Sequence, residues 1–513
     1  VTAIDRMAKL TKEDIVAFAN KYLKEDNYAV IYKKQGKDPN EKKMTKPEIT
    51  PIITNRDVTS PFLVEVQESA VKPIEPVFLD YQKDMSQLKA KSDIPVLYKQ
   101  NVANDLFQLI YVFDMGNNHD KALGTAFDYL EYLGTSDMTP EELKSEFYRL
   151  ACTFYVSPGN ERTYVVLSGL NENMPAAVQL FEKLLADAQV NKEAYTNMTS
   201  DILKARSDAK LNQGQNFSRL MSFAMYGPKS PATNLLTEAE LTNMNPQELV
   251  DRIHNQNSYK HRILYYGPSS SKDLLATINQ YHQVPAALKD IPAGNEYSYL
   301  ETPVTKVLVA PYDAKQIYMA QISNLDKKYD PAIEPIRALY DEYFGGGMNS
   351  IVFQEMRETR GLAYSAWASI MPPSYLKYPY VLRTQIATQN DKMIDAVTTF
   401  NDIINNMPES EAAFKLAKDG LTNRLRTERI IKGDIIWSYI NAQDLGQNVD
   451  PRIKLYNDIQ NMSLKDIVDF QKQWVKGRTY VYCILGDKKD LELDKLKAVG
   501  PIEELTQEQI FGY

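Results

Sequence analysis

The chain has 513 residues, of which 43% are hydrophobic and 25% charged, an ordinary composition for a globular protein. This length is too great for a single hydrophobic core and predicts two to four domains. The net charge of -8 disfavours nucleic acid as the main partner, and no apolar run approaches the roughly 18 residues that a membrane helix needs.

Residues 1–36 read as the end of a domain. Thr11 is a candidate cap for a helix that continues through Tyr22, and a strand is predicted for Tyr28–Tyr32. The chain starts at Val1 with no signal-like segment, so we expect that an N-terminal part has been removed.

The order of cap, helix and strand occurs twice more, after Asn245 and after Ser463. The last two copies belong to longer units that match each other. The segment YLEYLG at Tyr129–Gly134 echoes YDEYFG at Tyr340–Gly345, and a constant offset of 218 residues relates Glu193–Val250 to a later segment. These matches predict an internal duplication.

Residues 37–80 contain several prolines and few periodic apolar positions, which predicts a linker long enough to let its two sides move against each other. A second, shorter break is expected near Val284–Tyr299. Each unit after the linker opens with two strand-like runs, such as Lys306–Val309 and Gln316–Ile322. Further strands and long helices follow. Strands grouped between grouped helices predict an α+β fold with an antiparallel sheet packed against helices.

The segment Tyr340–Trp367 reads as a helix end, a turn at Gly345–Gly347, a second helix that Gly361 ends, and the start of a strand. It places Arg357 near a helix C-terminus and Tyr364 seven residues later. A guanidinium and a phenol brought together could both donate to one carbonyl or oxyanion. The alternative is that the arginine complements the helix dipole and the tyrosine is an interface aromatic.

Motifs for a self-contained catalytic centre are missing. None of the four histidines belongs to HExxH or HxxEH, and the spacing of His254 and His261 gives only weak support for a metal site. Neither Cys152 nor Cys483 lies near a histidine or in a metal motif, so two buried free thiols are expected. The four histidines are His119, His254, His261 and His282.

The segment FGGGMNSIVFQEMRETRGLAYSAW resembles the glycine–helix–RGLAY signature of the M16 (pitrilysin, or insulinase-like) zinc metallopeptidases. The resemblance covers essentially the whole chain. It implies homologous α+β domains of the LuxS/MPP-like metallohydrolase fold, four in the full protein, in two halves that close like a clamshell on a peptide. Residues 1–36 then resemble the tail of the second domain and 37–80 the interhalf linker. Residues 81–290 and 291–513 resemble the third and fourth domains.

The resemblance also implies where the chemistry lies. The family's zinc motif, HxxEH, is replaced in the third unit by Thr125–Tyr129, so no metal and no catalytic residue is expected in this chain. Zn²⁺ is expected in the missing N-terminal half. Arg357 and Tyr364 match the family's substrate-binding pair in the fourth domain. The full protein would hydrolyse peptide bonds as a protease, whereas this chain alone would be inactive.

The expected partners are the chain's own N-terminal half or a homologous zinc-bearing subunit, together with a peptide or unfolded polypeptide substrate. No nucleic acid and no transmembrane segment are expected. Two alternatives stay open: a non-catalytic scaffold or partner subunit, and a free-standing peptide-binding module. The sequence does not define the compartment, although a periplasmic setting would suit bacterial members.

Overall fold

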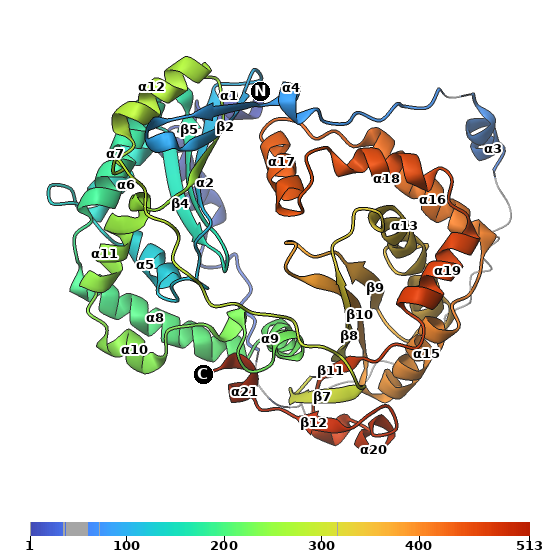
Figure 1. Cartoon of the computed structure of the whole chain (residues 1–513). Coiled ribbons are helices and arrows are strands. Elements are labelled where there is room, and N and C mark those ends of the chain that lie inside the picture. The colour runs from blue at the N-terminus through green and yellow to red at the C-terminus, as the bar shows by residue number, and fades with distance from the viewer. Residues whose placement is uncertain (1, 34–35, 37–59, 71, 315) are drawn as a thin grey trace. The chain divides into compact units, whose positions relative to one another are not determined.

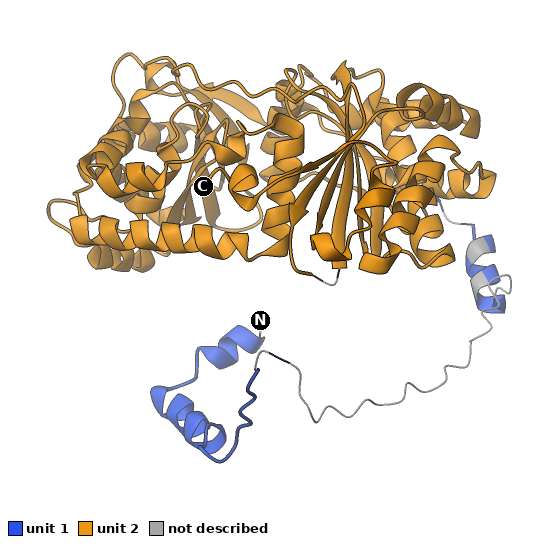
Figure 2. Cartoon of the chain, turned by 90° about the horizontal axis from the view of Figure 1, so that it is seen from below, with its two compact units in different colours: residues 1–72 blue, residues 73–513 orange. Residues whose placement is uncertain are grey.

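The computed structural model describes residues 2–33, 36, 60–70, 72–314 and 316–513. The chain forms two compact units, residues 1–72 and residues 73–513 (Figure 2). Within the described ranges, no helix combines the length and the apolar composition needed to cross a membrane.

The first unit has little core of its own. Its described helices are α1 (Thr2–Met7), α2 (Lys12–Tyr22) and α3 (Pro61–Glu68). As predicted, Thr11 caps α2, since its side chain accepts a hydrogen bond from the Asp14 amide at 3.2 Å. No residue of α2 is buried, and Phe18 is 62% exposed. The strand predicted for Tyr28–Tyr32 is wrong, because these residues have no described neighbouring strand with which to form a ladder.

The predicted linker, 37–80, is only partly described. Residues 37–59 lie outside the described residues. The later part is more ordered than a featureless linker, because it contains α3 and because Pro73 begins the second unit. There Leu79 is buried.

The second unit contains two six-stranded sheets (Figure 1). The first has the order β1-β2-β6-β3-β5-β4, and its strands are β1 (Ser86–Lys89), β2 (Pro95–Gln100), β3 (Leu106–Phe113), β4 (Cys152–Pro158), β5 (Thr163–Leu170) and β6 (Arg262–Gly267). The second has the order β12-β7-β11-β8-β10-β9, and its strands are β7 (Lys306–Pro311), β8 (Gln316–Lys328), β9 (Ser365–Met371), β10 (Pro379–Gln389), β11 (Val481–Gly486) and β12 (Ile502–Glu504).

The two sheets repeat one topology. The order β2-β6-β3-β5-β4 in the first sheet matches β7-β11-β8-β10-β9 in the second, strand for strand along the chain. The α+β class with two homologous units is therefore confirmed. Each sheet is mixed, because β2 pairs with β6, and β7 with β11, in parallel, while the other pairs of the repeated core are antiparallel.

Each sheet has its own main helical layer. The helices of the first repeat are α5 (Leu123–Leu130), α6 (Pro140–Arg149), α7 (Met174–Asp187), α8 (Lys192–Lys210), α9 (Gln213–Tyr226), α10 (Glu238–Asn243), α11 (Gln247–Asn255) and α12 (Ser271–Tyr281). Those of the second are α13 (Glu334–Phe344), α14 (Ile351–Phe353), α15 (Met393–Asn405), α16 (Glu411–Thr427), α17 (Asp434–Asp444), α18 (Pro451–Ile459), α19 (Leu464–Trp474), α20 (Leu493–Leu496) and α21 (Gln507–Phe511). In the first core α7 and α11 pack on β3, and in the second α13 and α19 pack on β8.

One helix of each repeat crosses to the other sheet. Helix α9 follows α8 in the first repeat, yet its Phe217 and Leu220 pack on Leu308 and Ala320 of the second sheet. Helix α17 follows α16 in the second repeat and packs on the first sheet (Figure 1). This exchange buries a face of each sheet that its own repeat leaves uncovered, so each sheet has a second hydrophobic core to which the other repeat contributes a helix.

Polar contacts reinforce the exchange. The Arg162 guanidinium next to β5 donates two hydrogen bonds of 2.6 Å to the Asp444 carboxylate at the end of α17. The side chains are only 12% and 16% exposed. Arg162 also donates to Asp114 at 2.6 Å. A bidentate pair of this kind fixes orientation as well as distance.

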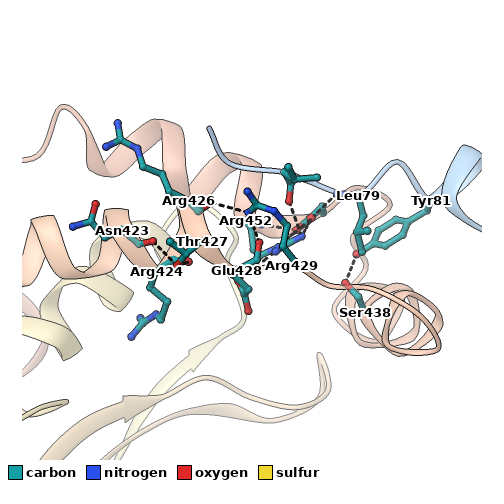
Figure 3. A network of polar contacts seen from close by, with 12 residues as sticks. Leu79, Tyr81, Asn423, Arg424, Arg426, Thr427, Glu428, Arg429, Ser438 and Arg452 are labelled. Atoms are coloured by element: carbon teal, nitrogen blue, oxygen red, sulfur yellow. Dashed lines mark hydrogen bonds and ion pairs between the residues drawn. The ribbon is translucent and has the colours of Figure 1, made fainter. Parts of the chain in front are cut away.

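The segment that enters the second unit is held by the second repeat (Figure 3). The Leu79 amide donates to Asp450 Oδ2 at 2.9 Å, and Arg452 Nη2 donates to the same carboxylate oxygen at 2.6 Å. Asp450 is buried. The Tyr81 hydroxyl lies 2.9 Å from Ser438 Oγ on α17. These contacts, which we call the entry clasp, attach the start of the first repeat to helices of the second.

Candidate functional site

The glycine turn after α13 is held against the edge strand β9. Gly345 lies so close to this strand that a Cβ would come within 2.3 Å of the Ala368 carbonyl oxygen. The Gly346 amide donates to the Asp341 carbonyl at 2.7 Å, whereas Gly347 would meet nothing within 4 Å. The first glycine is therefore required by close backbone approach, and the third faces open space.

Asp341 binds polar groups along the outer edge of β9, the edge that pairs with no other described strand. Its carboxylate accepts hydrogen bonds from the Ile370 amide at 2.9 Å and the Ser369 hydroxyl at 2.9 Å. Arg337 donates to it at 2.7 Å and also to the Ile370 carbonyl at 3.2 Å. Burial raises the pKa of Asp341 to about 6, against the opposing effect of Arg337. These side chains replace a neighbouring strand, which keeps this edge from pairing with another chain.

The second helix of the signature begins after Ser350, whose hydroxyl accepts from the Phe353 amide at 3.4 Å. Only α14 is α-helical, and Gln354–Thr359 form a π-helical turn. The sequence predicts an ordinary helix here, since no local residue pattern announces the wider turn. Such turns are rare and occur frequently at functional sites.

The structure brings Arg357 and Tyr364 together. The guanidinium carbon of Arg357 lies 5.1 Å from the centre of the Tyr364 ring and 4.9 Å from that of Phe353. Arg357 is 39% exposed and Tyr364 76% exposed. Neither side chain has a hydrogen-bond partner in the described part of the chain, so both polar groups are available to a ligand.

Gly361 makes this proximity possible. Its φ of 57° lies in the left-handed region, where a side chain is strained, and the chain reverses there so that Tyr364 returns to Arg357. Two hydrogen bonds hold the returning segment. Lys392 Nζ donates to the Gly361 carbonyl at 3.0 Å, and the Thr388 hydroxyl donates to the Leu362 carbonyl at 2.6 Å.

The segment that the resemblance aligns with the zinc motif, Thr125–Tyr129, lies on α5. Tyr129 is buried, and its hydroxyl donates to the Asn191 carbonyl at 2.6 Å. The Asp128 side chain is exposed, and desolvation by its surroundings raises the pKa of its carboxyl. No group of three or more His, Cys, Asp or Glu side chains able to hold a metal ion occurs among the described residues. Thr125, Asp128 and Tyr129 do not fit zinc.

A buried histidine pair is present that the sequence does not reveal. His261 Nε2 lies 2.8 Å from His282 Nε2, and His282 Nδ1 lies 2.6 Å from Glu182 Oε1. His261 Nδ1 lies 2.7 Å from the Tyr259 carbonyl. Burial, and then the neighbouring His282, lower the pKa of His261 to about 4. His254 lies on the surface and contacts the Ala188 carbonyl, so the structure gives no support to a metal site formed by His254 and His261.

The two cysteines are free and buried, as expected. Cys483 is fully buried in β11, and burial raises the pKa of its thiol to about 12. A thiol that stays protonated is a poor nucleophile. Cys152, at the start of β4, has its pKa raised for the same reason.

Comparison with known proteins places these features in a family. Residues 263–421 match the model described as the peptidase M16 inactive domain. The non-peptidase homolog YmxG of Helicobacter pylori is 23% identical over 422 residues, which are 78% of this chain and 93% of that protein.

Two solved structures have the same fold. The peptidase M16 inactive domain from Pseudomonas fluorescens superposes with a TM-score of 0.61 at 15% identity, covering 79% of this chain and 98% of that one. A mutant of the ferredoxin protease FusC, solved in complex with Arabidopsis ferredoxin, has a TM-score of 0.60 at 12% identity. The match covers 93% of this chain but only 51% of FusC, so this chain spans about half the length of that protease. Residues 263–421 match a peptidase M16 inactive domain, and 79% of the chain has the fold of a solved M16 inactive domain.

Proposed function

We propose that this chain is the C-terminal, non-zinc half of an M16-type metalloendopeptidase, which binds the peptide substrate and completes the active site when the two halves close. The observation that carries the proposal is the stacking of the Arg357 guanidinium on the Tyr364 ring, with both side chains free of hydrogen bonds to the described part of the chain. The M16 match and the half-length correspondence with FusC support it.

The paired residues are suited to a peptide carbonyl. The guanidinium carries N–H donors and the exposed phenol carries a hydroxyl donor, and the guanidinium carbon lies 5.1 Å from the centre of the phenol ring. When both groups donate to one carbonyl oxygen, they hold the substrate in place and stabilise the negative charge that develops on that oxygen. One preorganised donor of this kind contributes about 3 kcal/mol to the transition state.

The proposal also assigns a role to each part of the chain. Residues 81–290 and 291–513 act as the third and fourth M16-type domains. Residues 1–36 act as the tail of a preceding domain, and residues 37–80 act as the linker between the two halves. The metal-dependent chemistry belongs to a zinc-bearing half, either in the same polypeptide or in a homologous subunit. The substrate is a peptide or an unfolded polypeptide, and this chain alone is inactive.

The test is peptide turnover by the assembled peptidase carrying Arg357→Ala or Tyr364→Phe. We expect kcat/KM to fall about 100-fold for the arginine variant, with zinc content unchanged. Arg360→Ala is the matched control, because Arg360 is a neighbouring surface arginine that is 41% exposed and pairs with Glu355 at 3.4 Å. Unchanged turnover in both test variants, or an equal loss in the control, would refute the assigned roles.

The similarity to a non-peptidase homolog favours a second candidate, a non-catalytic M16-like scaffold or partner subunit. The reading frame upstream of Val1 separates the two. An HxxEH motif followed by a distal glutamate supports the peptidase, whereas a degraded motif supports the scaffold. A free-standing peptide-binding module would instead bind peptide tightly without any partner, which calorimetry on this chain measures.

A further inference from the structure

The position of the Arg357 guanidinium depends on two aromatic rings. Its carbon lies 4.9 Å from the ring centre of Phe353 and 5.1 Å from that of Tyr364. Phe353 comes from the helix before Arg357, and Tyr364 comes from the segment after Gly361. The guanidinium therefore contacts aromatic groups from both sides of its own position in the chain.

Other contacts hold Arg357 weakly. Its ion-pair partner is Glu358, with Nε and Oε1 3.5 Å apart, and both side chains are 39% exposed. An exposed ion pair at this distance contributes little, because solvent screens it and both side chains lose rotamer freedom. Cation–π contacts are directional, since the cation must lie over the face of the ring. The two rings are therefore what orients the guanidinium.

Phe353 is well placed to impose this orientation. It is partly buried, and the Ser350 hydroxyl that caps its helix accepts from its amide. The neighbouring Val352 and Met356 are buried in the core of the second repeat, which anchors the turn at both sides. Tyr364, in contrast, is 76% exposed, so its side chain is less constrained by packing than that of Phe353.

We propose that Phe353 is a positioning residue, which acts through Arg357 by holding the guanidinium over Tyr364 before substrate arrives. The proposal rests on the proposed function of the Arg357–Tyr364 pair. The Phe353 ring provides one face of the stack, so that the arginine presents the same N–H edge in the free and bound protein, and less rotamer freedom is lost on binding.

The test uses the assembled peptidase with Phe353→Leu, which keeps an apolar side chain but removes the aromatic face, and Phe353→Tyr, which restores that face. We expect kcat/KM to fall about threefold for the leucine variant and to stay near wild type for the tyrosine variant. The loss should appear in the same parameter, kcat or KM, as the loss caused by Arg357→Ala. In the Arg357→Ala background, Phe353→Leu should cause no further loss.

The outcomes separate this inference from the proposed function. If Arg357→Ala leaves turnover unchanged, the proposed function fails. If Arg357→Ala lowers turnover but Phe353→Leu does not, the positioning role is overturned and the function stands. An equal loss from Phe353→Leu with and without Arg357 would show that it acts through the fold, which also overturns the role. A ring-current shift of the Arg357 Nε–H resonance, lost in Phe353→Leu and kept in Phe353→Tyr, checks the stack without turnover.

Discussion

The buried histidine His261 makes the stability of the second unit sensitive to acid. Its Nδ1 faces the Tyr259 carbonyl at 2.7 Å and must carry the proton, so its Nε2 accepts from His282 at 2.8 Å. A second proton on His261 would place two N–H groups against each other in a site where His261 is only 7% exposed. This geometry agrees with a pKa lowered from 6.5 to about 4 by burial and by His282.

The magnitude follows from linkage between protonation and folding. A pKa that falls from 6.5 to about 4 corresponds to about 3 kcal/mol, since each pKa unit is about 1.4 kcal/mol. The unfolded chain takes up this proton below about pH 6.5, whereas the folded chain does not until about pH 4. The contribution of neutral His261 is therefore present above about pH 6.5 and is lost as the pH falls, by about 2 kcal/mol between about pH 7.5 and about pH 5.

The assay is urea unfolding of wild type and His261→Gln at these two pH values. Other groups titrate as well, so the informative quantity is the difference between the two proteins in the pH dependence of the free energy of unfolding. We expect the wild type to lose about 2 kcal/mol more than the variant on acidification. His254→Gln, at the surface, is the control and should behave as wild type. The same acid dependence in wild type and His261→Gln would refute the reasoning.

Three further predictions concern the exchanged helix, the entry clasp and the glycine turn. Asp444→Ala should lower the free energy of unfolding by about 3 kcal/mol, measured in urea, because it leaves its buried arginine partner without the bidentate contact. Asp450→Ala should also lower the free energy of unfolding by about 3 kcal/mol, because it leaves Arg452 without its buried partner. It should speed hydrogen exchange of the Leu79 amide, which donates to Asp450, and an unchanged exchange rate would contradict the entry clasp. Gly345→Ala should lower the stability by about 2 kcal/mol or more, because its Cβ would meet a backbone oxygen 2.3 Å away. For Gly347→Ala, whose Cβ would meet nothing within 4 Å, the free energy of unfolding should change by no more than about 0.5 kcal/mol. Equal shifts of the thermal unfolding midpoint for Gly345→Ala and Gly347→Ala would refute the packing argument.

Some features of this protein follow from local sequence alone. The cap at Thr11, the turn at Gly345–Gly347 and the end of the signature helix at Gly361 are found where the residue types predict them. The duplication is also readable, because matching periodicity in two segments requires matching elements, and the two sheets repeat one order. The proximity of Arg357 and Tyr364 follows from a helix end, a glycine and a reversal within seven residues.

Other features depend on contacts between residues far apart in the sequence. Tyr28–Tyr32 has a strand-like composition but lacks a described neighbour to pair with, and β propensity without a ladder partner does not make a strand. The exchange of α9 and α17 depends on which sheet face is left uncovered, a property of the assembled repeats.

The contact between His261 and His282 joins residues 21 positions apart in the sequence. The contact between Leu79 and Asp450 joins residues 371 positions apart. Local patterns report backbone preference and amphipathic faces, so the sequence by itself determined most elements of the two repeats and their duplication. Only the tertiary structure decided which buried polar groups meet, because that depends on the packing of the whole unit.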